Sequence, residues 1–261
     1  MSEILSMISI AAVTAVLISA SVQDIRTREV SDIHWLITGI IGMVMMIICI
    51  SDNVTVGRLM ICIGSLMILS DILYDRENSL FVNAIFYTIL AAMFLIPLIS
   101  FSGDTFVSNS VTIPVCYLIF LLFFYTGTIK GGADVKCLIS LSILFPVYPV
   151  MFCCPFIELP SSVITSVISF PLAVLFHAAL FSVIAMIPVM IRNIIRGDTR
   201  FPNMLSGYMM NKKDVSKAHV WVMSSEEFNE RVWVTPKIPF IVPITAAVLF
   251  VAFIGNIIFT I

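Results

Sequence analysis

Residues 4–22 read ILSMISIAAVTAVLISASV, an apolar run that contains no charged residue and is closely followed by Asp24. An uncharged run of about 18 or more apolar residues is long enough to cross the hydrocarbon core of a bilayer as one helix. Glu3 is the only charged residue before it, so the run lacks the basic start of a secretory signal peptide. We therefore expect it to be retained as the first of several membrane spans.

The rest of the chain repeats this pattern. Of its 261 residues, 60% are hydrophobic and only 11% are charged, so the polar side chains are too few to cover a water-facing surface. The sequence predicts an integral membrane protein with no nucleic-acid partner. We expect an all-α, polytopic transmembrane helical bundle of about eight spans, or six to eight, because prolines interrupt the sixth run and the seventh is long. The runs after the first are 33–50, 55–73, 81–101, 111–129, 137–154, 163–191 and 240–261.

The basic residues predict how these runs are oriented. If the N-terminus lies outside the cell, 13 of the 14 Lys and Arg residues fall on the cytoplasmic side, where short loops carry most of the basic residues. Arg58 alone falls outside. We divide the chain into a transmembrane helical domain (1–191), a cytoplasmic segment (192–239) and a C-terminal transmembrane helix (240–261). Within the segment, VSKAHVWVMS (215–224) alternates between apolar and polar residues and predicts a strand.

Two aspartates lie on the same side of this predicted bundle. Asp24 follows the first run, and Asp134 follows the fifth run in TGTIKGGADVK (126–136). An even number of runs separates them, which returns the chain to the cytoplasmic border. Two carboxylates held close together share a proton, so one can act as a general base on water and the other as an acid toward a carbonyl. The pair predicts peptide hydrolysis without a metal, a cofactor or a covalent intermediate.

The three residues directly before Asp134 are small: Gly131, Gly132 and Ala133. Minimal side chains let a substrate backbone or a neighbouring helix approach the acid closely. An aspartate beside a lysine at a membrane border is more often a solvated loop residue, so Asp134 alone does not identify a site. The prediction depends on its pairing with Asp24.

Three segments resemble one family. GGAD (131–134) resembles the GxGD motif of intramembrane aspartyl proteases, with Ala133 in place of the second glycine, and the VK that follows resembles the type IV prepilin peptidase branch. DIRTREVSD (24–32) resembles the first-aspartate segment of that branch. VWVTPKIPFIVPI (232–244) is similar to a segment of archaeal preflagellin peptidases.

The resemblance implies a membrane aspartyl endopeptidase with Asp24 and Asp134 as its catalytic pair. Its expected activity is to remove short basic leader peptides from membrane-inserted preflagellins or type IV pilin-like precursors, at the cytoplasmic face of the cell membrane. Members usually place two spans between the aspartates, whereas four runs lie between them here. An inserted helical hairpin explains the difference and leaves both acids on one face.

The bacterial members carry a cysteine-rich zinc domain that this sequence lacks. Its six cysteines contain no CxxC pair, so we expect neither a metal site nor the methyltransferase activity associated with that domain.

Two other functions stay open on the sequence alone. Paired membrane acids also carry protons or cations in transporters, although acids near mid-bilayer and an internal repeat are expected there. A catalytically idle scaffold for pilus or flagellum assembly is the second alternative, because of Ala133 and the long insertion. In a peptidase, the positive leader needs acidic partners near the site. The candidates are Glu29, Asp32, Asp75, Glu77, Glu226, Glu227 and Glu230.

Overall fold

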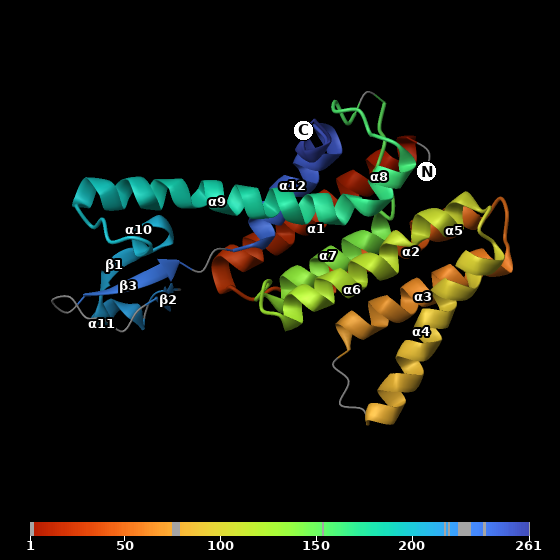
Figure 1. Ribbon diagram of the computed structural model, residues 1–261, viewed down its shortest axis with the longest axis horizontal. Helices are drawn as coiled ribbons and strands as arrows, with labels where there is room; N and C mark the ends of the chain where they lie inside the picture. Colours follow the sequence, from red (N-terminus) through yellow and green to blue (C-terminus); the bar gives the residue numbers. More distant parts are fainter. Residues whose placement is uncertain are drawn as a thin grey trace.

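The computed structural model of the chain describes residues 3–74, 79–152, 154–216, 218, 220–223, 231–236 and 239–260. These residues form a helical bundle with a small sheet at one end (Figure 1). Six helical segments among them are long and apolar enough to cross a membrane, by length and composition, which confirms the predicted all-α polytopic bundle. They are α1 (Glu3–Thr27), α2 (Ile33–Ile50), α3 (Val56–Leu73), α4 (Leu80–Ser100), the consecutive helices α5 (Thr105–Ser110) and α6 (Thr112–Tyr125), and α9 (Phe170–Arg196).

Two of the eight predicted spans form shorter helices than expected. The run at 137–154 contains α7 (Gly132–Leu144) and the run at 240–261 contains α12 (Ile241–Phe253), each of 13 residues. α7 ends before Pro146 because proline lacks the backbone N–H that a helix needs and restricts the residue before it. Among the described residues, six predicted spans form long helical segments and two form these short helices. The number of spans is thus within the expected range of six to eight.

The long seventh run at 163–191 is divided into two helices. The short helix α8 (Ser162–Val167) comes first, and α9 then begins at Phe170 with Pro171 in its first turn. Proline is well placed there because the first N–H groups of a helix have no partner within it. Gly197 ends α9 with a φ of 77°, a left-handed conformation that glycine adopts readily. The 3-10 helix η1 (Ile257–Thr260) follows α12.

α7 lies in the centre of the bundle. Every residue from Cys137 to Leu144 is buried, as expected for a helix that is apolar on all sides. It packs mainly against α2 and α6, and α12 packs against α9 and α1. α4 lies at the edge of the bundle, where it packs mainly against α3 (Figure 1). Asp134, in the first turn of α7, is therefore carried by a helix whose remaining turns are buried in the bundle.

Gly42 allows α2 to approach α7 closely. A β-carbon at this position would lie 2.9 Å from the backbone nitrogen of Leu144 and 3.0 Å from its Cα. Because these are backbone atoms of a buried helix, they cannot rotate away as a side chain can. We expect Gly42→Ala to destabilise the protein by about 1–3 kcal/mol, seen as a lower melting temperature in detergent. A β-carbon at Gly103 would meet nothing within 4 Å, so Gly103→Ala is the control, and equal melting temperatures would contradict the prediction.

The polar segment 192–239 carries a three-stranded antiparallel sheet in the order β1-β3-β2. The central strand β3 (Arg231–Pro236) pairs with β1 (Tyr208–Asn211) on one side and with β2 (Val220–Val222) on the other. β2 lies within the strand predicted at 215–224. Val232, Trp233 and Val234 of β3 are buried, so the sheet has a small core of its own.

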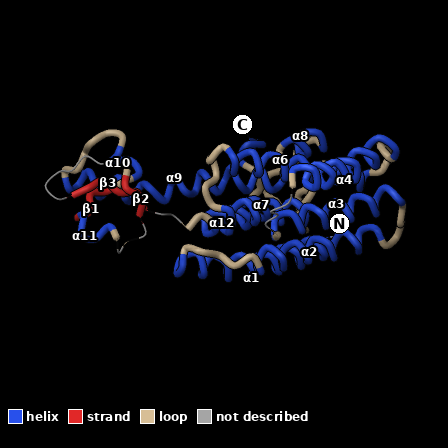
Figure 2. The backbone as a smooth tube through the Cα atoms, turned by 90° about the horizontal axis from the view of Figure 1, so that it is seen from below, coloured by secondary structure: helices blue, strands red, loops and turns tan. Residues whose placement is uncertain are grey.

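Asn193 fixes this sheet unit to the end of α9. Its side chain is buried, and its Nδ2 atom donates to the carbonyl oxygen of Met204 at 2.9 Å and to that of Gly207 at 2.5 Å. Figure 2 shows the sheet at one end of the molecule, near the end of α9, together with α10 (Asn203–Ser206) and α11 (Lys212–Val215). The sheet unit is thus held at the bundle end that carries the aspartates.

Ion pairs connect helix starts at both ends of the bundle. Lys136 Nζ lies 2.8 Å from Asp32 Oδ2, which joins α7 to the start of α2. At the other end, Arg58 Nε lies 2.7 Å from Asp104 Oδ2, and Arg58 Nη2 lies 3.1 Å from Asp104 Oδ1. This hydrogen-bonded contact with Arg58 holds the pKa of Asp104 below its usual value. Arg58, the one base on the outer side in the predicted topology, is therefore balanced by an acid.

Candidate active site

A cavity of about 670 Å³ opens where α1 ends and α7 begins. Asp24 and Asp134 both line it, so the structure brings together the two aspartates that the sequence pairs. The small residues directly before Asp134 line it as well. The cavity walls come from residues 28–30, from 128–133, from Trp221 of β2, from Pro236 of β3 and from residues 240–241 at the start of α12.

Asp24 is held between two helices. It lies in the last turn of α1 with a relative exposure of 8%, and its Oδ2 atom accepts the N–H of Ile241 at 3.3 Å. Ile241 is the first residue of α12, where a backbone N–H has no partner within the helix and a negative charge is favourable. The hydroxyls of Ser21 and Thr245 lie 2.8 Å apart and join α1 to α12 one turn away. These contacts fix the Asp24 carboxylate at the cavity wall.

Asp134 lies in the first turn of α7, and Gly131 is the N-cap residue of that helix. A β-carbon at Gly131 would lie 2.1 Å from Asp134 Oδ2 and 2.8 Å from its Cγ. The carboxylate therefore occupies the space that any side chain at position 131 would take. The absence of a side chain at Gly131 is what allows this position of the Asp134 carboxylate.

The two residues between Gly131 and Asp134 have different surroundings. Among the described residues, a β-carbon at Gly132 would have one neighbour within 4 Å, Phe124 Cε2 at 3.9 Å, which is an ordinary van der Waals distance. Ala133 is partly buried and packs against the hydrophobic core. The methyl group of Ala133, which replaces the second glycine of the family motif, is thus accommodated by the core.

The surroundings of Asp134 favour its protonated form. The residue is partly buried and precedes the apolar, fully buried part of α7, outside the six helices that are long enough to span a membrane. Burial, and to a smaller extent the negative charge of Asp24, raise the pKa of Asp134 to about 7. A carboxyl group with this pKa can donate a proton near neutral pH, which an ordinary aspartate cannot.

The acidic residues expected to receive a basic leader are only partly described. Glu29 lines the cavity. Asp32 follows it three residues later in the sequence and forms an ion pair with Lys136. The other five candidates, Asp75, Glu77, Glu226, Glu227 and Glu230, lie outside the described residues.

Asp71 stands apart from the aspartate pair. It lines a second cavity, of about 570 Å³, which shares Gly132 with the first. The hydroxyl of Tyr117 donates a hydrogen bond to Asp71 Oδ2. Asp71 does not line the cavity of Asp24 and Asp134, so it is not a third member of that site.

His177, in the first third of α9, is buried and hydrogen-bonded on both ring nitrogens. Nδ1 lies 2.8 Å from the carbonyl oxygen of Ala173, and Nε2 accepts the N–H of Ile257 at 3.4 Å. These contacts assign it to packing between α9 and the end of the chain. In the described part of the chain, no three His, Cys, Asp or Glu side chains form a group that could hold a metal ion.

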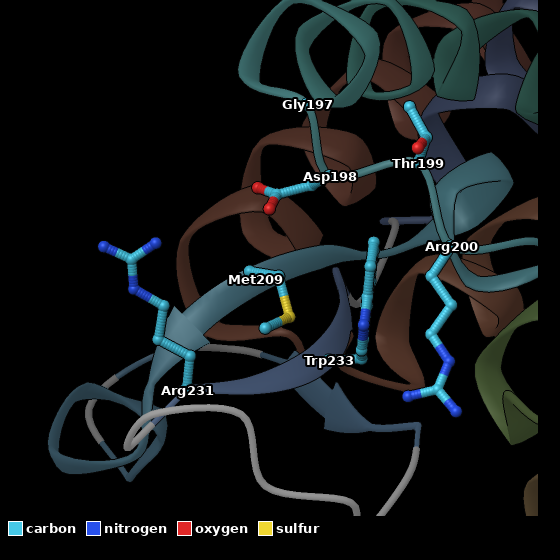
Figure 3. A pocket seen from close by; sticks show the side chains of 7 residues that line it. All are labelled: Gly197, Asp198, Thr199, Arg200, Met209, Arg231 and Trp233. Atoms are coloured by element: carbon cyan, nitrogen blue, oxygen red, sulfur yellow. The ribbon is translucent and has the colours of Figure 1, made fainter.

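A cavity of about 710 Å³ lies in the sheet unit (Figure 3). Asp198 is the one acidic side chain among its described lining residues, and the basic residues Arg200 and Arg231 line it together with Trp233. Among the described residues it shares no lining residue with the cavity of the two aspartates.

Three contributors to the site were not predicted from the sequence. Ile241, which donates to Asp24, is 217 residues away from it along the chain, and Trp221 reaches the cavity only through the pairing of β2 with β3. No local pattern reveals such contacts. Arg28 lies in the segment DIRTREVSD, and its position one helical turn after Asp24 is the local signal for a role at the site.

The fold and the site define a multi-pass helical membrane protein that brings two carboxylates to one cavity at the end of its bundle. No family model matches the chain. A curated preflagellin peptidase from Methanocaldococcus jannaschii is 30% identical over 168 residues, which cover 54% of this chain and 69% of that protein. A preflagellin peptidase from Methanococcus maripaludis is 26% identical over 262 residues, with 92% of each chain covered. The chain belongs to the preflagellin peptidase family, which confirms the resemblance drawn from its three motifs.

Proposed function

We propose that the chain is an aspartyl endopeptidase of the cell membrane that removes short basic leader peptides from preflagellins or type IV pilin-like precursors. Asp24 and Asp134 form the catalytic pair. The observation that carries the proposal is that both carboxylates line one cavity at the end of the bundle. The names of the two relatives support preflagellin as the substrate class.

The reaction takes place at the cytoplasmic face of the membrane. Asp24 ends α1 and Asp134 begins α7, and the ion pair of Lys136 with Asp32 joins neighbouring segments at this same end. In the topology that places 13 of the 14 basic residues on one side, this end is that side. Basic residues in short loops favour the cytoplasm, so a precursor with a cytoplasmic leader presents its cleavage site here.

Asp24 acts as the general base. Its Oδ2 atom accepts the N–H of Ile241, so Oδ1 is the oxygen that is left to take a proton. Asp24 removes that proton from a water molecule while the water oxygen bonds to the carbonyl carbon of the scissile peptide. Asp134 gives its own proton to the carbonyl oxygen, which produces an uncharged tetrahedral diol.

The diol then breaks down by the reverse proton transfers. The proton held by Asp24 passes to the peptide nitrogen as the carbon–nitrogen bond breaks, and a hydroxyl proton of the diol returns to Asp134. The products are the leader peptide, with a new C-terminal carboxyl group, and the mature protein, with a new N-terminal amino group. Both aspartates regain their starting protonation states, so the pair can act again.

The placement of the two acids favours hydrolysis over transport. Transport sites lie near the bilayer midplane, commonly between the halves of an internal repeat. Asp24 lies in the last turn of α1, and Asp134 lies in the first turn of α7. Both aspartates are therefore near the end of the bundle, away from the middle of the helices.

The test uses membranes that contain the protein and a membrane-inserted precursor with a Lys/Arg-plus-Gly leader junction. We expect one cleavage, at that junction, and mass spectrometry of the product gives its new N-terminus. A precursor with its basic leader replaced by a neutral sequence is the matched substrate control. Absence of any cleavage of the basic precursor by correctly inserted protein would contradict the proposal.

We expect the cleavage rate to fall as the pH rises above about 7. The pKa of Asp134 is raised to about 7, so its protonated, acid form is present below that pH and is lost as the pH increases through it. Initial rates measured from about pH 5.5 to 9 test this, with melting temperatures over the same range to detect unfolding. A rate that stays constant to the upper end of the range would rule out Asp134 as the acid.

A further inference from the structure

Arg28 has an unusual backbone conformation at the cavity wall. It directly follows α1 and has a φ of 59°, in the left-handed region that glycine and asparagine adopt most readily. Helices often end with a residue in this conformation, and glycine is the usual one. The turn itself therefore gives no reason for an arginine, and the reason has to be found in its side chain.

Two of the three nitrogen atoms of the Arg28 guanidinium lack hydrogen-bond partners in the described part of the chain. Its Nε and Nη1 atoms are buried and donate no hydrogen bond to any described residue, although Arg28 lines the cavity of the two aspartates and its charge interacts with that of Asp24. Arginine stays charged under all conditions relevant to proteins, and its N–H groups only donate. Leaving such donors buried and unpaired is costly. The arrangement points to acceptor atoms that arrive with a ligand.

The chemistry of the precursor identifies the acceptor. A basic leader has no carboxylate to offer Arg28, and its lysines and arginines are repelled by the like charge. Backbone carbonyl oxygens around the scissile bond are the acceptors that remain, because an extended chain exposes them in the cavity. Asp24 lies one helical turn before Arg28, so a carbonyl bound by Arg28 is kept close to the catalytic pair.

We propose that Arg28 is a substrate-binding residue whose guanidinium donates hydrogen bonds to backbone carbonyl oxygens of the precursor next to the scissile bond. It positions the chain, while Asp24 and Asp134 transfer the protons. This inference rests on the proposed function. Trp221 and Pro236 line the same cavity, so an extended precursor chain bound to Arg28 can pack against apolar side chains there.

Two variants remove the side chain without straining the backbone. Arg28→Gly and Arg28→Asn both suit a left-handed residue, so the protein is expected to keep its melting temperature or to gain stability. For both, we expect KM for the precursor to rise about ten-fold or more, as for loss of a hydrogen bond from a charged group. We expect kcat to change by less than about three-fold, since binding is lost rather than proton transfer.

Arg26→Asn is the matched control. Arg26 is exposed in the last turn of α1, and the structure does not place it at the cavity. The substitution removes the same charge two residues away, so unchanged KM and kcat are expected. Arg28→Lys retains the charge but lacks the planar set of donors, and its KM is expected to lie between those of the wild type and Arg28→Asn.

A binding measurement separates this inference from the proposed function. In protein that already carries Asp134→Asn, adding Arg28→Asn is expected to weaken binding of a fluorescent precursor peptide about ten-fold. If the wild type cleaves but KM and binding are unchanged in the Arg28 variants, the role of Arg28 is wrong and the peptidase assignment stands. If Arg28→Gly lowers the melting temperature, the side chain serves folding and the inference is wrong. If the wild type cleaves nothing, the proposed function itself has failed.

Discussion

Asp24→Asn and Asp134→Asn are each expected to lower the rate of precursor cleavage by about 10³-fold or more, because asparagine can neither take nor give the required proton. The structure explains why the variants should still fold. An asparagine oxygen at position 24 can accept the N–H of Ile241 as Oδ2 of Asp24 does, so the contact between α1 and α12 is kept. The Asp134 variant removes a partly buried acid and adds no bulk.

The measurement is cleavage of the precursor by membranes with equal amounts of each variant, followed on gels over time. Asp52→Asn is the control: Asp52 is an exposed acid in the turn between α2 and α3, at the opposite end of the bundle, and its variant should cleave at the wild-type rate. Near-normal cleavage by Asp24→Asn or Asp134→Asn would show that the substituted aspartate is a structural loop acid and that the proposed pair is wrong.

Glutamate should not restore activity at either position. Its additional methylene group moves the carboxylate by about 1 Å or more, and a displacement of that size costs about 100-fold in rate. At position 24 the longer side chain also moves away from the N–H of Ile241, which now holds Oδ2 at 3.3 Å. Rescue by Asp24→Glu would therefore argue that the position of this base is not fixed by α12.

The long helices were predictable because each depends on a local property, an uninterrupted apolar run. The same property overestimated α7 and α12. The run at 137–154 is apolar throughout, but Pro146 and Pro149 fall within it and α7 ends at Leu144. Hydropathy reports that a segment is buried, and it does not distinguish burial in lipid from burial in protein. For α7, complete burial among other helices accounts for the apolar run.

The placement of Asp24 and Asp134 at one end of the bundle was also predictable, because counting the runs puts both there. Their immediate surroundings were not. The N–H of Ile241 reaches Asp24 across 217 residues, and Trp221 reaches the cavity through the sheet. The conformation of Arg28 was hidden for a different reason, since its φ of 59° contradicts the preference of the residue type. Such departures from local preference are expected at functional sites.

Gly131→Ala is expected to lower the cleavage rate by about 100-fold, because the new methyl group would displace the Asp134 carboxylate, the proposed acid, by about 1 Å or more. A β-carbon at Gly131 would lie 2.1 Å from Asp134 Oδ2, and the carboxylate is the flexible group that must move. Alanine can adopt the backbone conformation of Gly131 without strain, since its φ is −87°. The variant should therefore fold normally while the acid points in a wrong direction.

Gly132→Ala, one residue further, is the matched control for this prediction. Among the described residues its β-carbon would meet only Phe124 Cε2 at 3.9 Å, and alanine is a better helix former than glycine. Gly132 lines the cavity, but its β-carbon does not meet the Asp134 carboxylate, so we expect a much smaller loss of rate than for Gly131→Ala and an equal or higher melting temperature. Cleavage rates and melting temperatures of the two variants, measured side by side, separate displacement of the carboxylate from general damage to α7. Equal activity of both variants would mean that cleavage does not require the Asp134 carboxylate to lie next to Gly131, and the prediction would be wrong.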